Sequence, residues 1–370
     1  MKPCYEVADV LQLKHDQIKQ LTINSWQART LYALAACRTP LLGGHIDRCT
    51  NPDCHALHMS YNSCRNRHCP KCQGHKREEW IRAREAELLN TTYFHIVFTL
   101  PDEFNQLALY QPALLYKLLF KVVWSVIQSF AANHQFLGAK TGMIAILHTW
   151  GQNLMLHPHL HCIVPGGGIT PANKWKPANK KDKYLFPVKA MSKVFRARML
   201  AAIRQHVPLK QTRAKALIQK KWCVYCKQPF WGPAQVIEYL GRYTHKIAIS
   251  NHRIKAIANN TITFTAKDYR MGGQKKLITL SHQEFIRRFA LHILPKAFVR
   301  IRHYGILASA IKQKVRVLVE KQIGKAPIIQ HPPSKHRLCH ICGTGQLITI
   351  ITFNCRGPPS LDLLPYLIPN

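Results

Sequence analysis

Two periodicities of apolar and polar residues alternate along the chain, one typical of helices and the other of strands. Apolar residues recur at helical spacing over residues 7–37, 75–89, 103–133, 189–219, 232–245 and 281–294. The last of these segments begins with Ser281 at the N-cap position and Glu284 at the capping-box position. These segments predict the helical part of the fold.

Short runs of β-branched and aromatic residues between these segments predict strands. The runs are "YFHIVFTLP" (93–101), "GMIAILHTW" (142–150), 159–164, "KIAIS" (246–250), "TITFTA" (261–266) and "KLITL" (276–280). A short connection separates the second run from the third, so we expect these two strands to pair antiparallel. Together the two periodicities predict an α+β fold with a central antiparallel sheet flanked by helices.

The chain carries a large excess of positive charge, which indicates a negatively charged partner. It has 53 Lys and Arg against 17 Asp and Glu, a formal net charge of +36. A field of this sign favours a polyanion, most simply nucleic acid. Because 47% of the 370 residues are hydrophobic, the charge belongs to a folded protein and not to a basic tail.

No segment of the sequence predicts a membrane partner. Residues 1–30 are polar and lack the apolar core of a secretory signal. The most apolar long stretch, 106–130, is interrupted by Lys117 and Lys121 and therefore predicts buried helices. In a chain without a signal, 13 cysteines argue for metal ligands and free thiols over disulfides.

The sequences "CTNPDC" and "CRNRHCPKC" stand in a segment with few aliphatic residues. Two close cysteine pairs there have the spacing of two knuckles around one tetrahedral ion. The pairs are Cys49 with Cys54 and Cys69 with Cys72. We expect these thiolates to bind a structural Zn²⁺, because four protein ligands leave no open position. Surplus candidate ligands stand beside them: Cys64 and His68.

A second cysteine feature stands near the C-terminus, after the linker-like stretch "APIIQHPPSKHR". Cys339 and Cys342 are followed by a glycine, which is typical of half a zinc knuckle. Candidates for the other half are His336, His340 and Cys355. The sequence leaves open whether zinc binds there.

The stretch "HPHLHCIVPGGG" places histidines at alternate positions of a predicted strand. His159 and His161 therefore point to the same face, and Leu160 between them points into the core. Two imidazoles on one rigid strand suit a divalent ion and leave positions open for a third ligand, water and substrate. His148 on the preceding strand is the favoured third ligand, and Gln152 is the alternative.

Tyr239 and Tyr243 lie at positions i and i+4 of a predicted helix, so both hydroxyls can face one point. Aromatic core packing would explain the same spacing. A tyrosine hydroxyl can attack a phosphodiester when a metal neutralises the phosphate. Basic side chains would then hold the rest of the strand, and the candidates are Arg65, Arg67, Arg242, Lys246, Arg253, Arg300 and Arg302.

In combination these motifs resemble the two-tyrosine HUH transposases of bacterial insertion sequences that move by a rolling-circle-like route. The resemblance covers most of residues 30–310 and rests on "YNSCRNRHCPKC", "YFHIVFTLP", "LHTWGQ", "HPHLHCIVPGGG", "YLGRYTHKIAISNHRI" and "EFIRRFALHILPKAFVRIRHYG". It implies a zinc-binding domain ahead of an HUH single-strand endonuclease that uses Mg²⁺ or Mn²⁺. His159 and His161 match the metal ligands, and Tyr239 and Tyr243 match the nucleophiles that form a 5′-phosphotyrosine.

The expected domains follow from this resemblance. They are a helical and cysteine-rich zinc-binding domain over 1–90, an HUH catalytic domain over 91–310 and a C-terminal tail over 311–370. The expected partner is single-stranded DNA at the element ends and the target site, in the bacterial cytoplasm. The oligomeric state and the order in which the tyrosines act stay open.

The distribution of acidic residues favours an HUH transposase over an RNase H-like transposase. Those enzymes need several carboxylates to hold two metals, whereas Asp182 is the only acid between residues 104 and 237. A plasmid replication initiator or a conjugative relaxase would share the tyrosine chemistry. A non-enzymatic zinc-dependent DNA-binding regulator, or an inactive transposase copy, would bind DNA without cleaving it.

Overall fold

The chain forms two units, each assembled from segments that are distant in the sequence. The computed structural model describes residues 3–72, 80–85, 87–179, 185–227, 235–236, 247–268, 271–327 and 337–358. The first unit comprises Met1–Lys76, Ile249–Ile293 and Gln330–Asn370. The second unit comprises Arg77–Ala248 and Leu294–Ile329.

A 5-stranded sheet forms the centre of the second unit. In sheet order its strands are β12 (Ile301–Gly305), β4 (Gly142–Trp150), β5 (Leu156–Pro165), β3 (Tyr93–Thr99) and β8 (Val224–Cys226). All neighbouring strands are antiparallel, and the expected pair forms with His148 opposite His159 across β4 and β5. The prediction of an α+β fold with a central antiparallel sheet is confirmed.

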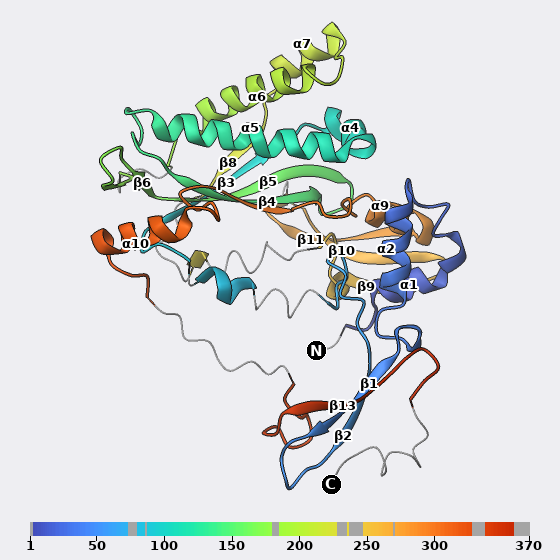
Figure 1. Cartoon of the computed structure of the whole chain (residues 1–370). Coiled ribbons are helices and arrows are strands. Elements are labelled where there is room, and N and C mark those ends of the chain that lie inside the picture. Colours follow the sequence, from blue (N-terminus) through green and yellow to red (C-terminus); the bar gives the residue numbers. More distant parts are fainter. Residues whose placement is uncertain are drawn as a thin grey trace. The chain divides into compact units, whose positions relative to one another are not determined.

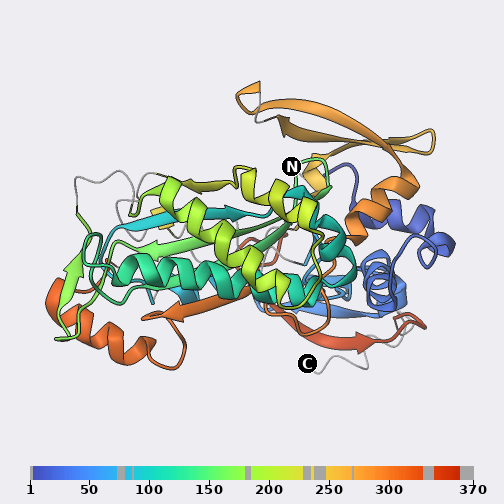
Figure 2. The same ribbon diagram turned by 90° about the horizontal axis from the view of Figure 1, so that it is seen from above.

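Helices cover one face of this sheet, as Figures 1 and 2 show. They are α4 (Asn105–Tyr110), α5 (Pro112–Ala132), α6 (Val188–Arg204) and α7 (Gln211–Gln219). Phe98 of β3 reaches this layer, where its ring centroid lies 5.2 Å from that of Phe195 on α6. By length and composition α5 could cross a membrane, but it is a core helix of this unit and buries Leu119, Val123 and Ile127.

The opposite face of the sheet packs against α10 (Lys312–Ile323) and the segment before β3. The buried apolar residues of this layer include Leu88, Leu89, Ile144, Ile146, Ile163, Val236 and Val319. Side chains alternate between the faces of a strand, so the face that carries Ile146 also carries His161, its partner across β4 and β5. A small hairpin, β6 (Gly167–Ile169) with β7 (Trp175–Pro177), follows β5.

The first unit contains a group of packed helices and a three-stranded meander. The helices are α1 (Val7–Leu13), α2 (Ser25–Ala35) and α9 (His282–Ala290), and the strands are β9 (Ile254–Ala258), β10 (Thr261–Asp268) and β11 (Gln274–Ser281). The Ser281 hydroxyl accepts a hydrogen bond of 3.2 Å from the Glu284 backbone N–H, which confirms the predicted N-cap of α9. This unit also has single 3₁₀ turns, η1 (His15–Gln17), η2 (Pro40–Leu42) and η4 (Asn251–Arg253), whereas η3 (Asp102–Phe104) belongs to the second unit.

A second sheet of the first unit contains strands from the N-terminal and the C-terminal parts of the chain. Its order is β13 (Leu347–Phe353), β1 (Gly44–Cys49) and β2 (Leu57–Tyr61), all antiparallel. This pairing corrects the expected boundaries, because the tail over 311–370 is not a separate domain. Its strand completes the sheet of the N-terminal hairpin, and α10 belongs to the second unit. The segment Ile249–Ile293, expected in the catalytic domain, lies in the first unit with α1 and α2.

Several local elements also differ from expectation. The helix expected over 189–219 is broken between α6 and α7, where Pro208 cannot continue a helix. No strand forms over the described residues 247–250 of "KIAIS". The elements β9, β12, α10 and β13 arise where the periodicity of the sequence predicted none.

Candidate functional site

Three histidines of β4 and β5 gather on the sheet face opposite α5 and α6. His148 on β4 is directly opposite His159 on β5, and Ile146 is opposite His161. Directly paired residues of antiparallel strands share a face, so all three imidazoles project to the same side. Leu160 projects to the other side and is fully buried, as the alternating pattern predicted.

The ligand atoms of the three histidines lie within 4.8 Å of one another. The ring centroid of His148 is 4.4 Å from that of His161 and 5.4 Å from that of His159. His148 and His161 are buried, and His159 is half-buried. Three imidazoles held by two paired strands are a donor set that fits a divalent ion with positions left for other ligands.

Hydrogen bonds to the ring nitrogens orient two of these histidines. His159 Nδ1 lies 2.6 Å from the His157 carbonyl oxygen, which can only accept. Nδ1 therefore carries the proton, and Nε2 of the neutral ring is the nitrogen that can coordinate an ion. His161 Nδ1 lies 2.9 Å from His95 Nε2 on β3.

His95 is a site residue that the sequence analysis missed. Burial lowers the pKa of His95 to about 3, with further contributions from the charges of Lys227 and His159, so the ring is neutral and its Nε2 can accept a hydrogen bond from His161. The sequence contained a signal for this contact, because His95 is the only histidine within the apolar run "YFHIVFTLP". A buried polar group in such a run needs a partner, and here the partner is His161.

The two candidate nucleophiles, Tyr239 and Tyr243, lie outside the described residues, as do Arg242 and Lys246. Val236, three residues before Tyr239, is described and fully buried. It packs in the apolar cluster that includes Ile146 and Ile163, on the face that carries the histidines. Gln152, the alternative third ligand, is half-buried in the connection between β4 and β5.

The four cysteines expected to form one zinc site fall into two separate groups. One group is Cys37, Cys64, Cys69 and Cys72, and the other is Cys49, Cys54, Cys339 and Cys342. The length of the β1–β2 hairpin explains the correction. Cys49 and Cys54 flank the turn at its tip, while Cys64 follows Tyr61, which pairs with Gly44 at its base. A strand of about five residues spans roughly 17 Å, too far for one ion.

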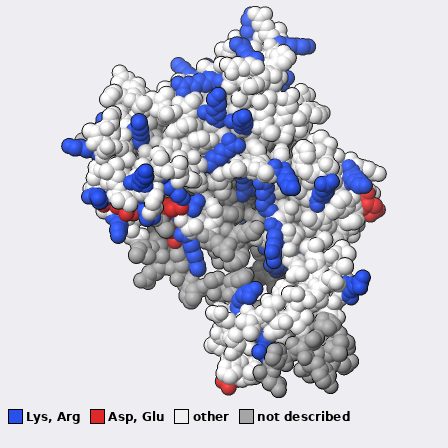
Figure 3. Space-filling model, in the orientation of Figure 1, with Lys and Arg blue, Asp and Glu red and all other residues white. Residues whose placement is uncertain are grey.

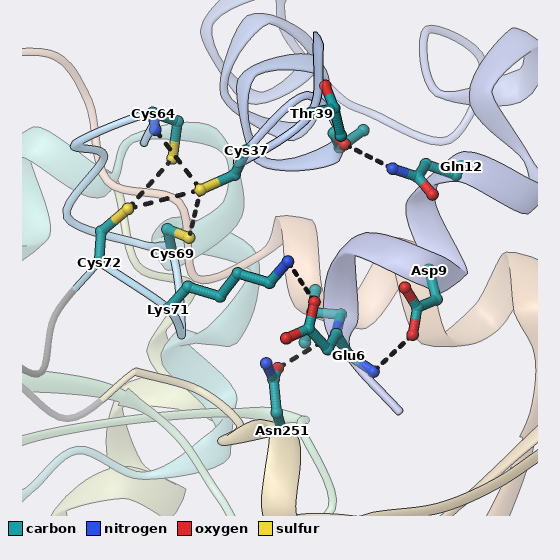
Figure 4. A network of polar contacts seen from close by, with 12 residues as sticks. Glu6, Asp9, Gln12, Cys37, Thr39, Cys64, Cys69, Lys71, Cys72 and Asn251 are labelled. Atoms are coloured by element: carbon teal, nitrogen blue, oxygen red, sulfur yellow. Dashed lines mark hydrogen bonds and ion pairs between the residues drawn. The ribbon is translucent and has the colours of Figure 1, made fainter. Parts of the chain in front are cut away.

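The side chains of the first group point toward one another, as Figure 4 shows. The Sγ atom of Cys37 lies 3.5 Å from that of Cys72 and 3.6 Å from that of Cys69. The Sγ atoms of Cys64 and Cys72 are 3.7 Å apart. A tetrahedron with metal–sulfur bonds of about 2.3 Å has edges of about 3.8 Å, so this donor set fits a structural Zn²⁺. The sequence analysis did not name Cys37 as a ligand and gave Cys64 only a surplus role.

Polar contacts hold the loop with Cys69 and Cys72 against the N-terminal helix (Figure 4). Lys71 forms an ion pair with Glu6, the N-cap residue of α1. The Val7 N–H donates to the Asn251 side-chain oxygen at 3.1 Å. The cysteine loop, α1 and the segment after Ile249 therefore form one packed structure within the first unit.

Basic side chains are spread over the described surface in Figure 3, and acidic side chains show at few places. Arg65, beside the first cysteine group, is exposed. Arg67 is half-buried, its Nε donates to His68 Nε2 at 3.3 Å, and burial lowers its pKa. Of these two candidate DNA contacts, Arg65 has the more accessible guanidinium.

Of the other described arginine candidates, Arg253 and Arg302 have side chains engaged in backbone or packing contacts. Arg253 Nε donates to the Thr265 carbonyl at 2.7 Å. Arg302 projects to the helix-covered face of the sheet, and its guanidinium lies 4.2 Å from the centroid of the Phe120 ring. The Arg300 carbonyl accepts from the Leu147 N–H at 3.0 Å. Arg302 is thus on the opposite face from the histidine group.

Two family models match the chain. Residues 10–100 match the model described as "Transposase zinc-binding domain", and residues 142–314 match the model described as "Putative transposase". The first match covers the six N-terminal cysteines of the two groups, and the second covers the three histidines and both tyrosines.

Two curated relatives align over most of the chain. "Putative transposase y4qJ" of Sinorhizobium fredii is 38% identical over 391 residues, which cover 96% of this chain and 97% of that protein. "Transposase for insertion sequence element IS801" of Pseudomonas savastanoi pv. phaseolicola is 29% identical over 306 residues, covering 77% and 71%. No solved structure matches the chain. The chain therefore belongs to the IS91- and IS801-type transposases, the HUH rolling-circle family with an N-terminal zinc-binding domain.

Proposed function

We propose that this transposase nicks and rejoins single-stranded DNA at the histidine group, through a 5′-phosphotyrosine intermediate. The observation that carries the proposal is the convergence of His148, His159 and His161, with ligand atoms within 4.8 Å on one rigid sheet face. In the sequence of the chain, Val236 of the apolar layer on this face precedes the segment with both tyrosines. The histidine group supports metal-assisted phosphodiester cleavage at this face.

The three histidines would hold Mg²⁺ or Mn²⁺. Such an ion, when bound, would neutralise charge on the scissile phosphate. His159 donates from Nδ1 to the His157 carbonyl, and His161 would likewise donate from Nδ1 to His95, which would leave Nε2 of both rings for the ion. Basic side chains such as Arg65 would hold the flanking strand through its phosphates.

The proposed cleavage step conserves the number of phosphoester bonds. The hydroxyl of Tyr239 or Tyr243 loses its proton, and its oxygen attacks the phosphorus. The bond from phosphorus to the 3′ oxygen breaks, and that oxygen leaves as a 3′-hydroxyl after taking up a proton. Because the phosphotyrosine bond replaces the broken phosphodiester, a 3′-hydroxyl can later reverse the step without ATP. A second tyrosine permits a second cleavage while the first link persists.

A covalent-capture assay tests this proposal. The full chain is mixed with single-stranded DNA from the element ends, with Mn²⁺ or with chelator, and separated on a denaturing gel. We expect a DNA-linked band that requires the metal and His161, and that disappears in the Tyr239→Phe/Tyr243→Phe double variant. The single tyrosine variants then rank the nucleophiles, and Tyr110→Phe, at an exposed position of α4, serves as control.

The same assay distinguishes the rival functions. A zinc-dependent DNA-binding regulator, or an inactive transposase copy, would bind the DNA in a mobility-shift assay and give no covalent band. That result would overturn the proposed mechanism, because binding and failure of cleavage would be measured on the same protein.

A further inference from the structure

We propose that Cys49, Cys54, Cys339 and Cys342 bind a second structural Zn²⁺, which fastens the C-terminal segment to the N-terminal hairpin. The matched zinc-binding region, residues 10–100, contains only the first two of these cysteines. The other two come from the opposite end of the chain. This proposal does not depend on the proposed catalytic function.

The four sulfurs have the spacing of a tetrahedral metal site. The Sγ atoms of Cys49 and Cys342 are 3.6 Å apart, and those of Cys54 and Cys339 are 3.8 Å apart. All four lie within 4.8 Å of one another. These separations match the edge of about 3.8 Å expected around Zn²⁺ and exceed a disulfide bond of about 2.05 Å.

The backbone around the second group has the turns of two knuckles. The Asn51 N–H points to Cys49 Sγ at 3.4 Å, and the Gly345 N–H points to Cys342 Sγ at 3.3 Å. Gly343, with a φ of 72°, donates its N–H to the Cys339 carbonyl at 2.9 Å. Such N–H groups directed at sulfur stabilise thiolates, the form that binds zinc.

Two further residues are adapted to the sulfur cluster. A Cβ atom at Gly345 would lie 2.3 Å from Cys49 Sγ, so only glycine fits there. His58 Nε2 lies 3.3 Å from Cys339 Sγ, within reach of an N–H···S hydrogen bond.

The residues that the sequence analysis offered as the other half of this knuckle are not among the four sulfur ligands. His340 packs edge-on against His58 at a centroid distance of 4.9 Å. His336 lies outside the described residues, and Cys355 is exposed.

Among its described residues, the sheet that carries the second group buries only two aliphatic side chains, Ile46 and Leu347. Its buried cluster consists of Cys49, Cys339 and Leu347. Larger apolar side chains of the same strands are exposed, including Met59 on β2 at 53% and Ile348 on β13 at 42%. A sheet this poor in buried aliphatic residues needs a staple, and metal binding can supply that folding free energy.

The consequence is a dependence of the N-terminal zinc-binding unit on the C-terminal segment. β13 pairs along the whole of β1, from Gly44 opposite Phe353 to Cys49 opposite Leu347. The ion would hold this pairing at the hairpin tip, where Cys339 and Cys342 meet Cys49 and Cys54. Removal of the C-terminal segment would leave two cysteines without their partners and expose one edge of β1.

Metal counting on the full chain tests the proposal. Native mass spectrometry is performed in a His159→Ala/His161→Ala background, so that an ion at the histidine group is not counted. We expect two zinc ions per chain. Cys339→Ser/Cys342→Ser should retain one ion, and Cys64→Ser/Cys69→Ser should also retain one. The matched control is Cys355→Ser, an exposed cysteine of the same C-terminal segment, which should retain two.

A ligand exchange keeps the test decisive if the paired serine variant does not fold. Cys342→His preserves a zinc ligand, so the chain should still bind two ions. After replacement of zinc by Co²⁺, its sulfur-to-cobalt absorption should fall by about one thiolate of eight, because each Cys₄ site holds four thiolates. Three outcomes would each overturn the proposal. They are a single ion in the parent chain, two ions in the Cys339→Ser/Cys342→Ser variant, and an unchanged cobalt absorption in Cys342→His. None of these readouts depends on DNA cleavage.

Discussion

His95 Nε2 lies 2.9 Å from His161 Nδ1, across the neighbouring strands β3 and β5. The two rings are nearly parallel, with an interplanar angle of 13° and centroids 5.1 Å apart. When His161 donates from Nδ1 in this contact, its Nε2 is left without a proton and can coordinate an ion together with His148 and His159. His95 is thus a positioning residue that acts through a proposed metal ligand.

His95→Ala should lower the affinity for the metal that supports DNA nicking, without abolishing nicking. Loss of such an outer partner typically costs 10- to 100-fold in metal affinity, so half-maximal nicking should need about 10- to 100-fold more Mn²⁺. His95→Gln keeps a hydrogen-bond acceptor and should recover most of the affinity. The measurement is nicking rate against Mn²⁺ concentration, with thermal unfolding as the control for structure. An unchanged Mn²⁺ requirement in a folded His95→Ala protein would contradict the positioning role.

Tyr225 should provide a stacking surface for an unpaired base beside the histidine group. It is opposite Val97 on β3, which is in turn opposite His161, so it projects to the same face, and it is 53% exposed. Base–aromatic stacking contributes about 1–3 kcal/mol per base. We therefore expect Tyr225→Ala to weaken single-stranded DNA binding by roughly 5- to 150-fold in fluorescence anisotropy titrations. Tyr110→Ala, at an exposed position of α4, should leave affinity unchanged, and equal effects of the two variants would refute the assignment.

Arg65 and Arg67 should respond differently to alanine substitution. The exposed Arg65 can reach a phosphate, so Arg65→Ala should reduce the slope of log K against log salt by about 0.7 on single-stranded DNA. The half-buried Arg67 donates to His68, so Arg67→Ala should chiefly lower the thermal stability of the first unit. Binding titrations at several salt concentrations, paired with thermal unfolding, separate the two effects. The same change of slope in both variants would contradict this division.

The stability of the second unit should fall as the pH is lowered, in part through His303. Burial lowers the pKa of His303 to about 4, and nearby positive charges add to this effect. The charged groups around it are Arg84, Glu87, Lys312 and Arg316. Between pH about 6.5 and about 4 the unfolded chain binds a proton at His303 that the folded chain does not, so stability decreases as the pH falls through this window.

Urea unfolding at fixed ionic strength measures this pH dependence. His303→Gln cannot take up the proton, so its free energy of unfolding should fall less between pH 7 and pH 5 than that of the parent chain. His206→Gln, at an exposed position, controls for the substitution itself. Parallel curves for the parent and His303→Gln proteins would show that His303 does not contribute.

The sequence determined the features that depend on local periodicity. The strand run at 142–150 became β4 with the same bounds, and the alternation of His159, Leu160 and His161 placed both histidines on one face. The N-cap of α9 also followed from local chemistry, because a serine hydroxyl satisfies an N–H three residues away. Adjacent strands with a short connection pair antiparallel, so His148 lies opposite His159 and close to His161.

Tertiary structure alone decided which distant residues meet. The spacing of the cysteines suggested one zinc site. The β1–β2 hairpin instead separates Cys49 and Cys54 from Cys69 and Cys72, and the first two lie beside cysteines of the C-terminal segment. His95 became a site residue only through the register of β3 against β5. Sequence spacing constrains neighbours through a few covalent bonds, whereas partners hundreds of residues apart are chosen by strand pairing and burial across the whole fold.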